Sequence, residues 1–203
     1  RSTTSASPRR STARAGATQP GGAPTLIGEF GIPYDLDGCA AYKAWADGDH
    51  SAGPWEKHII ALDLMYNAMD RHLLNSTQWN YTVSNRNDPS CGDGWNQEDL
   101  SVYSIDQDGG RAVEGFVRPF VRATQGALRD MKFDRASGEF SFRFTASPSI
   151  GLPTEVFIPR EQYPDGYRID APGLRAMDSP GSSVVRLQAS SAGDFHVTIR
   201  RAS

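Results

Sequence analysis

The 203-residue sequence predicts an α/β segment followed by a small antiparallel β-sandwich. A short apolar run, a long amphipathic pattern and a second β-prone run follow one another between residues 24 and 83, which is the order of a βαβ unit with parallel strands. From about residue 128, short alternating runs are separated by turn residues, which is typical of a sandwich. Residues 1–22 have almost no large apolar side chain, so we expect them to be disordered or linker-like. The expected divisions are therefore 1–22, 23–125 and 126–203.

The α/β segment begins with residues 24–31, a short β-prone run that indicates a buried strand carrying Glu29 near its end. Residues 32–53 show no clear period and indicate a long loop with one helical turn near residues 40–45. Pro54 suits a first helical position. Apolar residues spaced three and four apart then predict a helix that ends near residue 75: Trp55, Ile59, Leu62, Tyr66, Met69 and Leu73. Residues 77–83 have the composition of the second strand.

The remaining segments are shorter. Residues 84–97 are polar and Gly-rich and indicate a loop, and residues 100–104 have strand composition. Residues 111–127 indicate either a short final helix or an irregular connection. The sandwich is predicted from six runs that alternate or carry β-branched and aromatic residues: 131–133, 139–145, 154–158, 167–170, 183–189 and 194–200.

Composition excludes several classes of function. The net charge of −3 leaves no basic excess to neutralise phosphates, so we expect no nucleic-acid partner. No apolar run approaches the roughly 20 residues that a membrane-spanning helix requires. Cys39 and Cys91 lack the spacing of metal ligands, and two reduced thiols are favoured over one disulfide. The four histidines share no metal-like spacing either, so we expect neither a metal nor a cofactor.

Glu29 is the first candidate for chemistry, because it lies at the carboxyl end of a predicted parallel strand. In α/β barrels the active site is built at that end of the strands. Trp79, followed by Asn80, is expected at the same face, and residues 92–99 again combine an indole, amides and acids. Sugars stack on aromatic rings and bind amides and carboxylates through their hydroxyls. The alternatives are an ion-paired or loop-capping Glu29 and a loop that caps itself around a packed tryptophan.

An ordered set of segments resembles the family 5 glycoside hydrolases, in the branch of endoglycoceramidases, fungal glucosylceramidases and steryl-β-glucosidases. Residues 24–35 (PTLIGEFGIPYD) resemble that family's seventh barrel strand. Residues 41–49, the eighth-strand segment 79–81 (WNY) and residues 92–101 (GDGWNQEDLS) agree in order. Residues 115–120 (GFVRPF) resemble the junction with that branch's C-terminal β-sandwich. The resemblance implies the last two strands and connecting helix of a (β/α)8 barrel, followed by an antiparallel β-sandwich domain.

The resemblance also implies roles for individual residues. The family's nucleophile falls on Glu29, and the tryptophan that walls its sugar subsite falls on Trp79. The other residues expected to shape the site and bind substrate are Asn80, Asp93, Trp95, Asn96, Glu98 and Asp99. The family's acid/base glutamate lies on the fourth strand in an Asn-Glu motif, and no such strand is found here. We therefore expect a C-terminal fragment that is inactive without the N-terminal part of the barrel, and we do not expect Glu98 to replace the missing acid.

The implied reaction is retaining hydrolysis of a β-glucoside. The implied substrate is a glycolipid such as a glycosylceramide or a steryl glucoside, reached through transient contact with a membrane surface. The aglycone, the choice of endo or exo cleavage, the compartment and the oligomeric state stay open. Two strands and one helix leave an open sheet edge and an uncovered apolar face, so we expect low stability or association through that face.

The alternative function is a non-catalytic carbohydrate- or lipid-binding β-sandwich module. Four aromatic residues are its candidates: Phe120, Phe157, Tyr163 and Tyr167. Because Phe and Tyr in strands are mostly core residues, this reading is the less favoured one.

Overall fold

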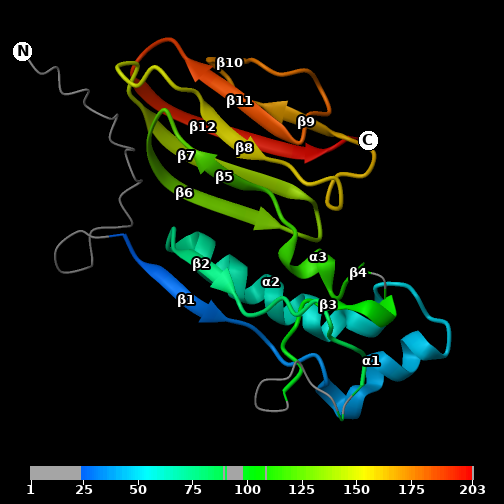
Figure 1. The fold of residues 1–203 in the computed structure, drawn as a ribbon. Coiled ribbons are helices and arrows are strands. Elements are labelled where there is room, and N and C mark those ends of the chain that lie inside the picture. The colour runs from blue at the N-terminus through cyan, green and yellow to red at the C-terminus, as the bar shows by residue number, and fades with distance from the viewer. Residues whose placement is uncertain (1–23, 89, 91–97, 108, 203) are drawn as a thin grey trace, which may run out of the picture.

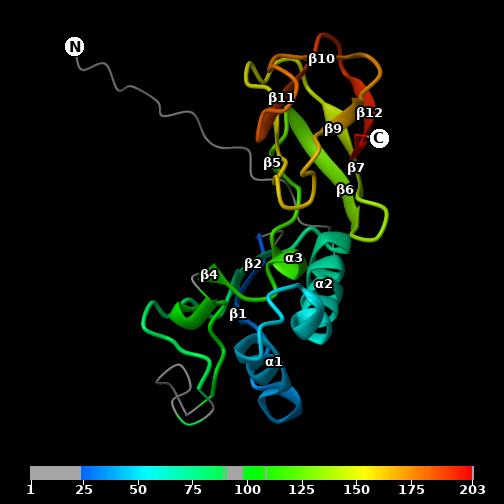
Figure 2. The ribbon, with the colours of Figure 1, turned by 90° about the vertical axis from the view of Figure 1, so that its right-hand side faces the viewer.

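A computed structural model describes residues 24–88, 90, 98–107 and 109–202 of the chain. It has an α/β part and a β-sandwich (Figure 1). Figure 2, turned by 90°, also shows the sandwich at one end of the molecule, next to α2 (Glu56–Arg71) and α3 (Val113–Phe116). Among the described residues, no helix is long and apolar enough to cross a lipid bilayer.

The α/β part contains the predicted parallel strand pair. β1 (Leu26–Phe30) pairs in parallel with β2 (Asn75–Gln78), with Ile27 opposite Ser76 and Phe30 opposite Gln78. The chain returns from one strand to the next through α1 (Leu36–Ala46), the 3-10 turn η1 (Gly53–Trp55) and α2. The second strand begins two residues earlier than predicted and ends before Trp79, so Trp79 belongs to the segment after the strand.

The first helix is longer than the single turn predicted from the sequence. Its first turn is irregular, because Asp37, Gly38 and Cys39 have left-handed φ angles of 55°, 62° and 64°. This break in the helical repeat explains why the sequence shows no clear period here. The regular part buries Tyr42 against Trp55, the last residue of η1. Cys39 is buried and has a free thiol, whereas Cys91 lies outside the described residues.

The long helix α2 follows the predicted apolar spacing. Ile59 and Leu62 are fully buried in the core of the α/β part, together with Tyr34 and Trp55. The short helix α3 crosses α2 at Gly115, where any side chain would collide with the backbone of Ile59. The segment between β2 and α3 contains β3 (Tyr103–Ser104), the 3-10 turn η2 (Ile105–Gln107) and β4 (Gly109–Gly110).

The sandwich consists of two four-stranded antiparallel sheets, in the orders β10-β11-β8-β5 and β6-β7-β12-β9. β5 pairs with β8, so the sandwich begins at Phe120, before the expected boundary at residue 126. Residues 111–127, expected to form either a short final helix or an irregular connection, contain the four-residue helix α3 and then β5. The strands are β5 (Phe120–Ala123), β6 (Gly126–Asp134), β7 (Glu139–Ala146), β8 (Thr154–Phe157), β9 (Tyr167–Asp170), β10 (Leu174–Ala176), β11 (Val184–Ala189) and β12 (Gly193–Arg201).

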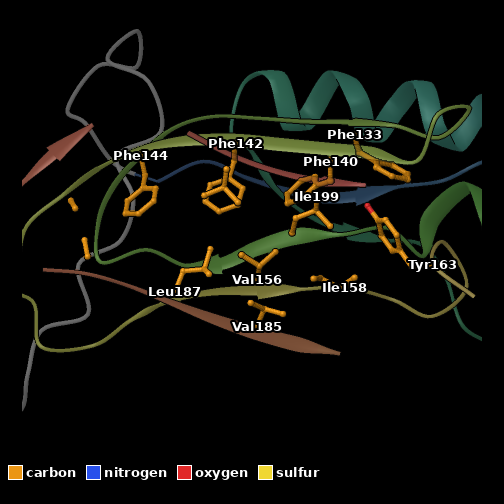
Figure 3. Packing of buried hydrophobic residues seen from close by; sticks show 13 residues of the cluster. Phe133, Phe140, Phe142, Phe144, Val156, Ile158, Tyr163, Val185, Leu187 and Ile199 are labelled. Atoms are coloured by element: carbon orange, nitrogen blue, oxygen red, sulfur yellow. The ribbon is translucent and has the colours of Figure 1, made fainter. Parts of the chain in front are cut away.

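The sandwich core follows from strand alternation. Phe140, Phe142 and Phe144 point from one face of β7 toward the other sheet, where Val156 and Leu187 meet them (Figure 3). All five side chains are fully buried. Because each such side chain stabilises the fold by roughly 1.5–3 kcal/mol when buried, this aromatic row is a major source of the sandwich's stability.

A polar joint connects the sandwich to the long helix. Arg118 is buried and forms ion pairs with Asp63 (3.2 Å) and Asp70 (2.9 Å) of α2. Its guanidinium carbon also lies 5.2 Å from the ring centre of Phe133 in the sandwich. The side-chain amide of Gln162 donates to the carbonyl of Val117 at 2.9 Å. The joint is therefore held by directional contacts between the two parts.

Candidate active site at the ends of two parallel strands

Glu29 lies one residue before the end of β1, and its side chain is exposed. Because β1 and β2 are parallel, their carboxyl ends meet at the same edge, and Trp79 directly follows β2. The backbone N–H of Trp79 donates to the carbonyl of Phe30 at 2.7 Å, which brings the two strand ends together. Within the described part of the chain, no residue forms an ion pair with Glu29. Glu29 is therefore an exposed residue on the strand whose end is hydrogen-bonded to the segment of Trp79.

The backbone around Trp79 is held on both sides. On one side Gly31 lies so close that a Cβ atom there would collide with the carbonyl oxygen of Trp79. On the other side Asn80 donates its N–H to the carbonyl of Leu100 (3.0 Å) and accepts from the N–H of Val102 (2.9 Å). The peptide bond between Trp79 and Asn80 is cis. Trp79 is half-buried.

Asp99 does not lie at an accessible mouth of the site. Its side chain is 1% exposed and forms a bidentate ion pair with Arg111, which is 0% exposed. The hydroxyl of Tyr42 donates to one carboxylate oxygen and the amide of Asn85 donates to the other at 3.1 Å. A carboxylate with these partners and no access to solvent cannot bind a sugar hydroxyl, so Asp99 holds the fold rather than the substrate.

Aromatic rings surround this ion pair. The guanidinium carbon of Arg111 lies 4.3 Å from the ring centre of Tyr34 and 5.7 Å from that of Trp55. Burial raises the pKa of Tyr34, and burial together with the hydrogen bond to Asp99 raises the pKa of Tyr42. Burial lowers the pKa of His58, whose Nε2–H donates to the carbonyl of Tyr34 at 3.1 Å. These groups stay neutral near pH 7, so Arg111 and Asp99 are the charged pair at the centre of the cluster.

The structure places the sequence-predicted residues in three groups. Glu29, Trp79 and Asn80 come together at the carboxyl ends of β1 and β2. Glu98 is exposed and immediately precedes the buried Asp99. The remaining candidates lie outside the described residues: Asp93, Trp95 and Asn96. Within the described ranges, no three His, Cys, Asp or Glu side chains gather as metal ligands do.

Sequence reasoning missed Arg111, Tyr42 and Asn85 as determinants of this region. Each contacts Asp99 in the structure, although they lie on three separate segments. The one available signal was Tyr42 itself, which lies in a segment that carries the resemblance. Nothing local to Arg111 indicates burial, because arginine is mostly exposed unless it is paired.

Comparisons with known proteins find similar sequences and structures. Residues 118–200 match the family model described as the glycoside hydrolase family 5 C-terminal domain. A glucosylceramidase of Rhizopus delemar is 29% identical over 161 residues, which cover 69% of this chain and 22% of that protein. Endoglycoceramidase I of Rhodococcus hoagii is 27% identical over 184 residues, which cover 91% of this chain and 29% of that protein. The crystal structure of Cryptococcus neoformans sterylglucosidase 1 superposes with a TM-score of 0.76 at 29% identity, covering 90% of this chain and 29% of that one.

These matches confirm the predicted resemblance to the family 5 glycoside hydrolases of the glucosylceramidase, endoglycoceramidase and sterylglucosidase type. Residues 118–200 match the C-terminal domain of that family, and the antiparallel sheets fit a β-sandwich. The chain spans less than a third of the length of either curated relative, 22% and 29%. The roles of Glu29 and Trp79 stay predictions.

Proposed function

We propose that this chain is the C-terminal part of a retaining β-glycoside hydrolase that cleaves a glycolipid β-glucoside, with Glu29 as its nucleophile. The observation that carries the proposal is the exposed carboxylate of Glu29 at the carboxyl end of β1, beside the segment of Trp79 after the parallel β2. The printed names of the relatives, glucosylceramidase, endoglycoceramidase and sterylglucosidase, support a glycolipid as substrate.

In the proposed mechanism, Glu29 attacks the anomeric carbon and forms a covalent glycosyl-enzyme intermediate that water then hydrolyses. The indole of Trp79 stacks on the apolar face of the sugar, and the amide of Asn80 lies next to it along the chain. Stacking orients the sugar so that its anomeric carbon faces Glu29. Orientation of this kind removes part of the entropic barrier to attack.

A retaining mechanism needs a second carboxyl group, about 5–5.5 Å from the nucleophile, that protonates the leaving oxygen. Asp99 does not meet this need, because its carboxylate is buried and paired with Arg111. Glu98 is exposed next to it, and no described contact aims it at Glu29. We infer that the acid comes from another barrel segment and that this chain alone is inactive toward glycolipids, since acid assistance contributes roughly 10²–10⁴-fold to the rate.

The surface of α2 supports the proposal of a larger barrel. Ile60 and Leu64 lie on the face of α2 away from its buried residues, and both are exposed, Leu64 by 64%. Leu26 at the start of β1 is exposed as well. Helices and strands of a barrel cover such apolar side chains on both flanks. The proposed partner for this face is the N-terminal portion of the same barrel.

Hydrolysis assays separate the parts of this proposal. The purified chain is incubated with glucosylceramide and with 2,4-dinitrophenyl β-glucoside, whose leaving group departs without protonation. We expect no glucose from glucosylceramide, and slow release of dinitrophenolate that Glu29→Gln abolishes and Glu98→Gln preserves. Turnover of glucosylceramide that Glu29→Gln abolishes would contradict the inactivity of the chain. Equal release by Glu29→Gln and the unchanged chain would contradict the role of Glu29.

One observation favours a second function, a carbohydrate- or lipid-binding surface on the sandwich. Phe120 is 42% exposed, and its ring centre lies 5.4 Å from that of Phe157 on the neighbouring strand. An open hollow of about 450 Å³ borders the same sheet, lined by Arg122, Glu155, Asp178, Ser182, Ser183, Val184 and Arg186. Of the other two aromatic candidates, Tyr163 is 3% exposed, and Tyr167 is half-buried with its hydroxyl donating to the carbonyl of Ser182.

Co-sedimentation of the chain with glucosylceramide-containing vesicles tests this second function. If the sandwich binds them, Phe120→Ser lowers the bound fraction and Glu29→Gln does not. An equal bound fraction for Phe120→Ser and the unchanged chain would exclude the Phe120 surface.

A further inference from the structure

We propose that Asp99 and Arg111 are positioning residues, whose buried ion pair fixes Trp79 and Asn80 relative to Glu29. The inference rests on the proposed function, because it assumes that Trp79 forms one wall of a sugar site. It assigns Asp99 a role different from the substrate contact predicted from the sequence. Neither residue touches the substrate in this account; both act through the backbone that they hold.

The ion pair first fixes the segment that contains residues 99–102. Nη1 of Arg111 donates to one oxygen of Asp99 at 2.7 Å, and Nη2 donates to the other. Nη2 also donates to the carbonyl of Ser101, and the backbone N–H of Arg111 donates to the carbonyl of Val102 at 2.8 Å. One arginine thus binds three residues of this segment, through both its side chain and its backbone.

This segment in turn holds the backbone after β2. Asn80 shares two hydrogen bonds with it, to the carbonyl of Leu100 and from the N–H of Val102. Ser101 adds a third contact, since its hydroxyl oxygen accepts from the N–H of Thr82 at 3.0 Å. Any displacement of residues 99–102 therefore moves Asn80, and with it the neighbouring Trp79.

Asp99 also reaches the loop that follows β1. Its backbone carbonyl accepts from the N–H of Tyr34 at 2.7 Å, five residues after Glu29. Its side chain accepts from the amide of Asn85, in the segment after β2. The same residue therefore connects the chain beyond both parallel strands, so its position sets the spacing between their ends.

The planar guanidinium of Arg111 makes the ion pair with Asp99 specific for arginine. Arginine presents several N–H donors in a fixed fork that matches the two oxygens of a carboxylate, and lysine does not. Both partners are buried, so a substitution that removes one of them leaves an uncompensated charge among aromatic rings and destabilises the fold. Tyr42→Phe is the mildest change available, since it removes one donor to Asp99 and keeps the ring that packs on Trp55.

The test uses the whole chain, labelled with ¹⁵N, and the indole N–H resonance of Trp79 assigned with Trp79→Phe. Three variants are compared: Asp99→Asn, Tyr42→Phe and the control Arg118→Gln. Arg118 is also buried and ion-paired, but its partners Asp63 and Asp70 lie on α2. Each variant is also titrated with 4-nitrophenyl β-glucoside, with chemical-shift change as the readout.

We expect Asp99→Asn and Tyr42→Phe to shift the indole resonance of Trp79 and the amide resonance of Asn80, and Arg118→Gln to leave both in place. We expect the glucoside to bind roughly tenfold or more weakly to Asp99→Asn, since small misplacements at such sites have large effects. If Asp99→Asn does not fold, the resonances of Trp79 and Asn80 in Tyr42→Phe provide the test. Unchanged Trp79 and Asn80 resonances in Tyr42→Phe would overturn the proposal. No response of Trp79 to the glucoside in the unchanged chain would instead refute the proposed sugar site, whatever the variants show.

Discussion

At the residue scale, the approach of Gly31 to Trp79 leaves no room for a side chain. We expect Gly31→Ala to push the carbonyl of Trp79 away and to lower the free energy of unfolding by about 1–3 kcal/mol, the usual cost of overpacking. Gly28→Ala in the same strand is the control, because no atom lies within 4 Å of the added carbon. Chemical denaturation of both variants measures the difference. Equal losses of stability would show that Gly31 is not a contact point for Trp79.

His58 makes the α/β core sensitive to acid. Burial lowers its pKa below 6.5, the hydrogen bond to the carbonyl of Tyr34 opposes this shift, and the charge of Arg111 adds to it. A group whose folded pKa is lowered stabilises the fold fully above pH 6.5 and loses that contribution as the pH falls through the folded pKa. We therefore expect the stability advantage of the unchanged chain over His58→Gln to shrink between pH 7 and pH 5. Denaturation midpoints across this range measure it, and a constant difference would contradict the assignment.

The candidate site was predictable only where a local pattern marks it. Glu29 and Trp79 each follow a recognisable β-prone run, and parallel strands place their ends together. The burial of Asp99 was not predictable, because its partners Arg111, Tyr42 and Asn85 come from three separate segments. Asp99 follows the exposed Glu98 in a polar stretch of sequence. Without knowledge of its partner Arg111, Asp99 therefore looks like a surface residue.

At the scale of elements, α2 presents apolar residues on two faces. One face is buried in the α/β core, and the other exposes Ile60 and Leu64. We expect the chain to self-associate through this second face at micromolar concentration and Leu64→Lys to reduce that association. Leu152→Lys is the control, because Leu152 is even more exposed but lies in a loop of the sandwich. Sedimentation velocity measures the self-association of the chain and of both variants. If Leu64→Lys and Leu152→Lys weaken it equally, α2 is not the contact.

Helices and strands were predicted correctly where the spacing of apolar residues repeats over a long segment. The spacing of Trp55, Ile59 and Leu62 identifies α2, and the composition around it identifies two parallel strands. β5 was missed, because four residues between a short helix and a longer strand carry too few repeats to reveal a period. Its pairing with β8 is a tertiary contact, which no local pattern encodes.

At the scale of the whole molecule, Arg118 joins the helix to the sandwich. Because Asp63, Asp70 and the ring of Phe133 all surround its guanidinium, we expect Arg118→Gln to cost about 3 kcal/mol or more. We also expect its loss to separate the unfolding of the α/β part from that of the sandwich. Arg135→Gln is the control, since its ion pair with Glu56 is partly exposed and contributes less than about 1 kcal/mol. Differential scanning calorimetry should show two transitions for Arg118→Gln and the unchanged profile for Arg135→Gln; a single shifted transition for Arg118→Gln would contradict the joint.

Covalent labelling identifies the carboxylate that attacks the anomeric carbon. The chain is incubated with 2,4-dinitrophenyl 2-deoxy-2-fluoro-β-glucoside, whose leaving group needs no acid and whose glycosyl-enzyme hydrolyses slowly. Peptide mass spectrometry then locates the added fluoroglucosyl group. We predict that it lies on Glu29 and that Glu29→Gln abolishes it, whereas a label on another carboxylate, or none at all in the unchanged chain, would contradict Glu29 as the nucleophile.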